Sequence, residues 1–147
     1  MNLAILHYHL RPGGVFQVIA NQLRSLNNTL SVDDPYRVAI FHGIENEDEC
    51  SSQWPMSSHL QVSTRAIDGL GYDQESKSFT ETSSLATRLL TALDACQFFP
   101  QDTVIHVHNH SLGKNTSLPG ALKIIAGKGY PLLLQIHDFA EDFRVEQ

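Results

Sequence analysis

The amino-acid sequence predicts an α/β fold, with a mostly parallel, Rossmann-like sheet and helices on both faces. Runs of strand-like residues alternate with segments whose apolar residues recur at helical spacing. Several of the strand-like runs are almost continuously apolar, which is typical of parallel strands covered on both faces. The chain has 147 residues, so we expect one domain over residues 1–147.

The first half of the chain predicts three strands and one helix. Residues 2–9 form an apolar run and are predicted to be a buried strand. Residues 15–26 carry apolar side chains at helical spacing, and two asparagines follow them as a helix end. Residues 36–42 predict the second strand, and residues 60–66 alternate as a third strand does. The polar, acidic segment 43–59 between them is predicted to be a loop.

The second half continues the alternation with two helices and two strands. Residues 68–80 are interrupted by glycines and predict a loop. Residues 82–96 carry a leucine stripe and predict a helix, which the strand-like segment 103–109 follows. Residues 118–127 predict the last helix, because glycines stop the helical pattern there. The apolar segment 130–137 predicts the final strand.

Composition excludes several classes of protein. The formal net charge is -6 and the isoelectric point is about 5.7, so no basic surface is expected to neutralise nucleic acid. Cys50 and Cys96 lie far apart, which argues against a disulfide framework or a structural zinc site, and Cys96 is expected to be a buried apolar residue. There is no signal-peptide pattern and no apolar run long enough to span a membrane, so we expect a cytoplasmic protein.

Polar residues collect where the predicted strands end. Ligands of open parallel sheets bind at the edge formed by the carboxyl ends of the strands. A role in filling the core does not explain why so many histidines stand at these positions. The residues concerned are His7, His9, His42, His106, His108, Asn109, His137 and Asp138, with His110 in the next loop.

The Gly13–Gly14 pair stands between the first strand and the first helix. One interpretation is a plain tight turn, because glycine permits backbone conformations that other residues avoid. The other is an anion site, because a helix N-terminus presents unpaired N–H groups and a ligand can approach a glycine backbone closely. The segment matches neither the GxGxxG dinucleotide pattern nor the P-loop pattern.

The histidines near the fourth and fifth strands allow two kinds of chemistry. His106 and His108 alternate on a strand and share a face, so they predict a metal pair that His137 and Asp138 complete, as in a metal-dependent hydrolase. Alternatively they are neutral, hydrogen-bonding histidines in a polar cleft. His137 beside Asp138 is likewise either a general base with its carboxylate or a structural pair.

Three segments together resemble a known family. They are HYHLRPGGVFQVI (7–19), HNHSLGKN (108–115) and YPLLLQIHDFAEDFR (130–144). In this order they resemble the N-terminal domain of retaining glycosyltransferases of family 4, which have the GT-B fold. The resemblance extends over nearly the whole chain. It implies a Rossmann-like domain that supplies the acceptor site, with a nucleotide-sugar donor in the cleft between this domain and a second one.

The resemblance also implies roles for particular residues. Gly13 and Gly14 would face the donor diphosphate, while His137 would approach the transferred sugar with Asp138 beside it as the catalytic pair. No metal or other cofactor is implied, since the nucleotide sugar is a substrate. The implied acceptor-binding residues are His9, His108, Asn109, His110, Lys114 and Arg144.

The sequence departs from the family pattern where the second domain should begin. In that family the second domain carries most of the nucleotide-sugar contacts, and this sequence stops just after Arg144. We therefore expect a fragment, a truncated product or one half of a split enzyme, inactive by itself and prone to self-association through its uncovered apolar face. A sugar or a lipid is the expected acceptor, so peripheral attachment to the inner membrane face is an alternative location. A metal-dependent hydrolase and a non-catalytic module that binds an anion or a partner remain the alternative functions.

Overall fold

The computed structural model describes residues 1–31, 35–43, 54–55, 57–75 and 80–138 of the chain. It has an α/β architecture with a five-stranded, fully parallel sheet, which confirms the predicted Rossmann-like fold class. The described elements are β1 (Asn2–Leu6), α1 (Gly14–Thr29), β2 (Tyr36–His42), β3 (Leu60–Ala66), the short 3₁₀ helix η2 (Asp73–Glu75), α2 (Thr82–Ala95), β4 (Thr103–His108), α3 (Leu118–Gly127) and β5 (Leu132–Gln135).

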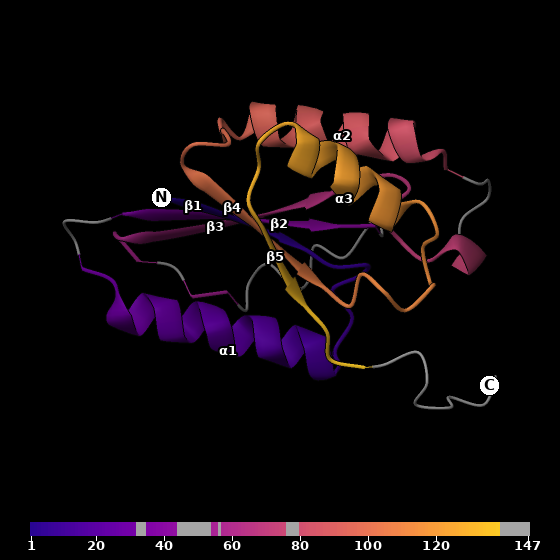
Figure 1. The fold of residues 1–147 in the computed structure, drawn as a ribbon. Helices are drawn as coiled ribbons and strands as arrows, with labels where there is room; N and C mark the ends of the chain where they lie inside the picture. The colour runs from indigo at the N-terminus through magenta and orange to yellow at the C-terminus, as the bar shows by residue number, and fades with distance from the viewer. Residues whose placement is uncertain (32–34, 44–53, 56, 76–79, 139–147) are drawn as a thin grey trace.

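The strands lie side by side in the order β3-β2-β1-β4-β5. Figure 1 shows α1 on one face of the sheet and α2 and α3 together on the other. The chain thus starts in the middle strand, builds outward to β3, crosses the sheet and builds outward again to β5. This reversal lies between β1 and β4, at whose carboxyl ends a ligand crevice is expected in such sheets.

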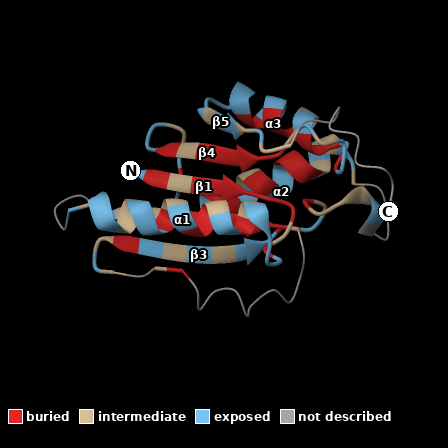
Figure 2. Cartoon of the chain, turned by 90° about the horizontal axis from the view of Figure 1, so that it is seen from below, coloured by how far each residue is buried: buried red, intermediate tan, exposed pale blue. Residues whose placement is uncertain are grey.

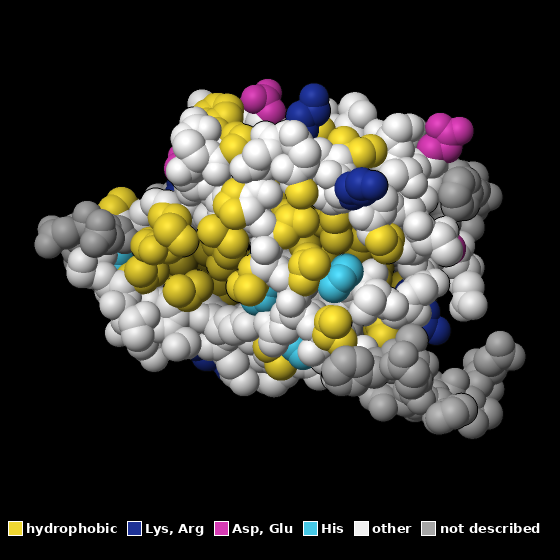
Figure 3. Space-filling view, in the orientation of Figure 1, with side chains coloured by type: hydrophobic (Ala, Val, Ile, Leu, Met, Phe, Trp, Pro, Cys, Tyr) yellow, Lys and Arg dark blue, Asp and Glu magenta, His cyan; other side chains and the backbone are white. Residues whose placement is uncertain are grey.

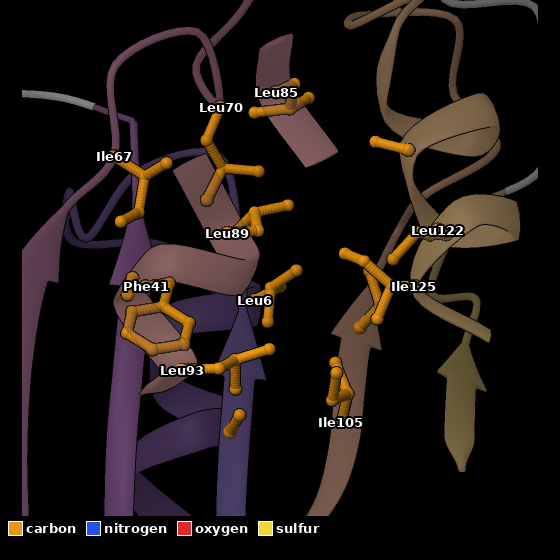
Figure 4. Packing of buried hydrophobic residues seen from close by; sticks show 14 of the residues in the cluster. Leu6, Phe41, Ile67, Leu70, Leu85, Leu89, Leu93, Ile105, Leu122 and Ile125 are labelled. Carbon is orange, nitrogen blue, oxygen red and sulfur yellow. The ribbon is translucent and has the colours of Figure 1, made fainter. Parts of the chain in front are cut away.

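Alternate residues of the central strands pack on opposite faces of the sheet. Leu6, Phe41 and Ile105 face α2 and α3, where they pack with Leu89 and Ile125 in one buried cluster (Figure 4). The other face is covered by α1. A second cluster there contains Ile5, Leu10, Phe16, Ile19, Leu23, Val38, Ile40, Trp54 and Leu60.

Burial decreases from the middle of the sheet to its edges. Figure 2 shows β1 and β4 buried over most of their length, and β3 mostly exposed or intermediate. At the other edge, Leu133 and Leu134 of β5 are 52% and 46% exposed, although the apolar run predicts a strand like β1. Ile136 is also exposed, and Figure 3 shows hydrophobic side chains gathered on the face where β5 is seen, with histidines beside them.

The observed elements follow the predicted ones closely, with shifts at their ends. The first and last strands are shorter than the predicted 2–9 and 130–137, because β1 ends at Leu6 and β5 covers only Leu132–Gln135. Most of the predicted loop 43–59, including Cys50, lies outside the described residues. Cys96 is half-buried at the rim of the core rather than enclosed in it. Among the described helices, none is long and apolar enough to cross a lipid bilayer.

Candidate functional site

A cavity of about 560 Å³ opens at the carboxyl edge of the sheet, beside the N-terminus of α1. The segments that follow β1, β4 and β5 all contribute to it, as the topology of the sheet leads one to expect. Seven of the ten residues to which the family resemblance assigns a role line this one cavity. They are His9, Gly13, Gly14, Asn109, Lys114, His137 and Asp138.

The two glycines at the start of α1 are not required by the local backbone. Gly13 is extended, with φ 171°, and Gly14 begins the helix, so neither has the positive φ that favours glycine. A Cβ on Gly14 would meet nothing within 4 Å, and a Cβ on Gly13 would meet only the Arg11 carbonyl oxygen at 3.9 Å. The tight-turn explanation is therefore weak, because alanine would fit both positions within the folded chain.

The N-terminus of α1 is open toward the cavity. No side chain caps this 16-residue helix, and Gly13 and Gly14 are both exposed. The first amide groups of a helix lack partners within the helix and carry a partial positive charge. The two glycines without side chains therefore leave these amides accessible to an anion of the size of a phosphate.

His7 lies on the wall of the same cavity and is held neutral. It is 5% exposed, and its Nδ1 has no hydrogen-bond partner within the described residues. Burial, followed by repulsion from His9 and His137, lowers the pKa of His7 to about 4, although a hydrogen bond with the His108 backbone opposes the shift. A buried ring nitrogen without a partner is costly, so its place beside the cavity suits an incoming hydrogen-bond donor or a bound water.

Three further histidines form a chain of ring contacts from β4 to the end of β5. The rings of His106 and His108 lie 4.3 Å apart between centroids, and His108 Nδ1 lies 2.7 Å from His137 Nε2. One of these two nitrogens must carry the shared proton. Burial, with repulsion from neighbouring histidines, lowers the pKa of His108 to about 3, and burial also lowers the pKa of His106.

Gln135 fixes the other end of this chain of histidines. Its Oε1 lies 2.9 Å from His106 Nε2 and accepts a second hydrogen bond from Gln22 of α1 at 3.1 Å. His106 therefore donates through Nε2. The contact ties the histidines of β4 to both β5 and α1, so their positions are set by three elements of the fold.

Asn109 ties together the ends of β1, β4 and β5. It is 2% exposed and has the left-handed φ of 57°, which asparagine tolerates better than most residues. Its Oδ1 accepts from the backbone amides of His137 and Asp138, at 2.7 and 3.3 Å, and its Nδ2 donates to Asp138 Oδ2 at 3.1 Å. Its carbonyl oxygen accepts from the Tyr8 hydroxyl at 2.9 Å. Asn109 thus positions the predicted catalytic pair as well as lining the cavity.

Another part of the wall is built by Tyr72 and Lys114, which both line the cavity. Asp73, next to Tyr72, donates its backbone N–H to the Lys114 carbonyl oxygen at 2.8 Å, so the two segments lie side by side. Arg11 adds a second cation to the lining, and Asp138 is the one carboxylate among the described lining residues. The lining of the cavity is therefore net positive, whereas the chain as a whole carries a net charge of -6.

Two of the predicted site residues, His108 and His110, do not line the cavity, and a third falls outside the described part of the chain. His108 is fully buried and contacts the cavity only through His7 and His137, with its Nε2 lacking a partner among the described residues. His110 is half-buried outside the lining. Arg144 lies outside the described residues. Within the part of the chain that the structure describes, no three histidine, cysteine or acidic side chains converge as a metal ion requires.

Tyr72 lines the cavity, although the sequence does not single it out. It stands in the predicted loop 68–80 without any pattern that marks it as functional. His7 and Arg11 also line the cavity: in the sequence, His7 stands at the end of the first predicted strand, and Arg11 is a cation within the segment 7–19. Their position beside the α1 N-terminus was the available signal.

The chain is similar to part of a known glycosyltransferase. It is 30% identical over 154 aligned positions to the mannosylglucosyl-3-phosphoglycerate synthase of Petrotoga mobilis (strain DSM 10674 / SJ95). The alignment includes 99% of this chain and 27% of that enzyme, so the chain spans about a quarter of its relative's length. No family model matches the chain, and no solved structure matches it significantly. The similarity supports a glycosyltransferase-like domain with a Rossmann-like fold.

Proposed function

We propose that this chain forms the acceptor-side, N-terminal domain of a retaining GT-B glycosyltransferase, which transfers a sugar from a nucleotide-sugar donor. The observation that carries the proposal is the exposed Gly13–Gly14 pair at the uncapped end of α1. Neither glycine is demanded by its φ or by packing, and both line the cavity. A ligand that approaches the backbone closely would explain why glycine stands at both positions.

In this proposal the donor diphosphate binds at the α1 N-terminus. The N–H groups near Gly13 and Gly14 stabilise the negative charge that develops on the diphosphate as the sugar leaves it. His137 supports charge at the transferred sugar; Asn109 accepts from the His137 backbone amide and donates to the Asp138 carboxylate beside it. Neutral His108 supports the His137 ring by the hydrogen bond between them. No metal is needed for these steps.

The acceptor would be an anionic sugar or a related lipid. The name of the relative describes a product that contains two sugar units and a phosphoglycerate. Arg11 and Lys114 in the cavity lining match a negatively charged acceptor by simple attraction. The proposed acceptor contacts are His9, Asn109 and Lys114 within the cavity, with His108, His110 and Arg144 from the resemblance.

Turnover would require the second domain, which supplies most nucleotide-sugar contacts in the family that the sequence resembles. We therefore propose that the isolated 147-residue chain binds but does not transfer sugar. The exposed apolar side chains of β5 fit a surface that this second domain or another copy covers. Self-association and a cytoplasmic location stay predictions.

The test follows the amide resonances of the ¹⁵N-labelled chain during titration with inorganic pyrophosphate. We expect saturable shifts centred on Gly13, Gly14 and Val15, because a helix N-terminus holds the anion through its backbone. The double variant Gly13→Ala and Gly14→Ala should bind pyrophosphate at least about tenfold more weakly. Its thermal stability should stay the same or rise, since alanine fits both sites.

A glycine outside the cavity serves as the matched control. Gly127 in the last turn of α3 also has open space for a Cβ and no positive φ, but it lies outside the cavity. Gly127→Ala should therefore leave pyrophosphate binding unchanged. The proposal fails if pyrophosphate shifts no amide near α1, or if the double variant binds it as tightly as the parent chain does.

A further inference from the structure

The side chain of Tyr72 forms an aromatic wall of the cavity. It is half-buried and touches two rings from the segment after β1. Its centroid lies 5.0 Å from that of Tyr8 at an interplanar angle of 54°, and 5.4 Å from that of His9 at 86°. Both neighbours meet the Tyr72 ring at a steep angle, and the Tyr72 side chain lines the cavity beside them.

The backbone around Tyr72 is held firmly by Asn115. The Asn115 Nδ2 group donates to the carbonyl oxygens of Gly69 and Gly71, at 2.8 and 2.7 Å, on the N-terminal side of Tyr72. Its Oδ1 accepts from the amides of Ser117 and Leu118 at the start of α3. Asn115 is 2% exposed, so a buried side chain joins the Tyr72 segment to a helix end.

Two further contacts lock the same segment. On the C-terminal side of Tyr72, Asp73 Oδ2 accepts from the backbone amide and hydroxyl of Thr116, at 2.9 and 2.8 Å. On the other side, Gly43, just after β2, packs directly on Gly71, where a Cβ on Gly43 would collide with the Gly71 backbone. This amount of fixation in a loop without regular strands indicates that the position of the Tyr72 ring matters.

We propose that Tyr72 is a stacking platform for the pyranose ring of the acceptor, and that Asn115 is the residue that positions it. The apolar C–H face of a sugar packs well on an aromatic ring, while its hydroxyl groups need polar neighbours. His9 and Lys114 stand beside Tyr72 in the cavity and supply such neighbours. This inference rests on the proposed function, since it assigns the acceptor subsite of the same cavity.

The experiment measures binding of methyl α-D-glucopyranoside, a simple pyranose, to the full 147-residue chain by saturation-transfer NMR. We expect the Tyr72→Phe variant to keep sugar binding, because it retains the ring. Tyr72→Ala should weaken binding by about three- to tenfold. The matched control is Phe99→Ala, which removes a 41% exposed aromatic ring outside the cavity and should change nothing.

Asn115→Asp tests the positioning role. It keeps an oxygen for the amides of Ser117 and Leu118 but loses the donor to Gly69 and Gly71. We expect it to weaken sugar binding as Tyr72→Ala does, while pyrophosphate binding at Gly13–Gly14 stays as in the parent chain. A structural role alone would lower thermal stability without this selective loss of sugar binding.

Each outcome bears on the inference. Sugar binding that is absent from the parent chain, or unchanged in Tyr72→Ala, overturns the platform even when pyrophosphate binds normally. Uridine or guanosine that binds in a Tyr72-dependent way in place of the pyranose overturns it too, because the ring would then hold a nucleobase. Loss of pyrophosphate binding alone overturns the proposed donor site and leaves the sugar platform supported.

Discussion

The two faces of β4 are buried to the same degree but carry different chemistry. Ile105 and Val107 are fully buried against α2 and α3 in an apolar cluster. His106 and His108, which alternate with them, are 5% and 0% exposed on the other face and contact other polar side chains. Apolar burial stabilises the fold, whereas a buried ring nitrogen without a partner costs stability. The apolar face is therefore held by packing, whereas the histidine face is held by specific hydrogen bonds.

Truncation on the apolar face should have the largest effect on stability. Ile105→Ala removes a fully buried side chain from the tightly packed cluster below α3, so we expect a loss of about 2–5 kcal/mol in the free energy of unfolding. Chemical denaturation measures it. Leu134→Ala at the exposed edge is the matched control and should cost less than about 1 kcal/mol. Equal losses would mean that β5 is covered in solution, as in a self-associated form.

Acidification should act through the buried histidines, because protonating a buried ring is costly. The pKa of His7 is lowered from 6.5 to about 4, so the folded chain keeps this ring neutral while the unfolded chain takes up a proton. Stability is therefore full above about pH 6.5 and falls as the pH drops toward 4, by about 2 kcal/mol at about pH 5 for His7 alone. The lowered pKa of His108, about 3, extends the loss in the same direction.

Chemical denaturation at a series of pH values checks this prediction and separates the contributions of the two faces of β4. Ile105→Ala should lower the whole stability curve without changing its slope between pH 4 and 6.5, because no titrating group is lost. His108→Asn should flatten the curve in the same window. A slope unaffected by His108→Asn would contradict the depressed pKa of this histidine.

A smaller loss of stability is expected when Asn109, at the carboxyl edge of the sheet, is replaced. Asn109→Ala removes the hydrogen bonds to the His137 amide and to Asp138. It also puts alanine, whose side chain forms no hydrogen bonds, at the left-handed φ of 57°. We expect a loss of about 1–3 kcal/mol. Asn109→Gly should recover about 1 kcal/mol of it, because glycine adopts this φ freely. If both variants are equally unstable, the hydrogen bonds carry the whole effect and the backbone conformation none.

The elements of the fold were predictable from local patterns. The observed bounds of β2, β3 and α3 are those that the sequence predicts, because apolar periodicity and glycine breakers act within a few residues. The gathering of His9, Asn109 and His137 at one cavity was also foreseeable, since parallel strands end at the same edge. The role of Asn109 as a tie between three strand ends was not, because it depends on a φ and on partners about 28 and 101 positions away.

Local sequence patterns are enough to predict the alternation of strands and helices, the edge of the sheet at which polar residues collect, and the glycine pair at the start of α1. Three features depend on the folded chain: β5 stands at an edge with Leu133 and Leu134 exposed, no turn geometry requires Gly13 and Gly14, and Tyr72 lines the cavity. The two groups of features differ in the sequence distance over which they arise. Periodicity reports which face of an element is apolar, whereas contacts such as Asn115 with Gly71 form only when crossovers bring distant segments together.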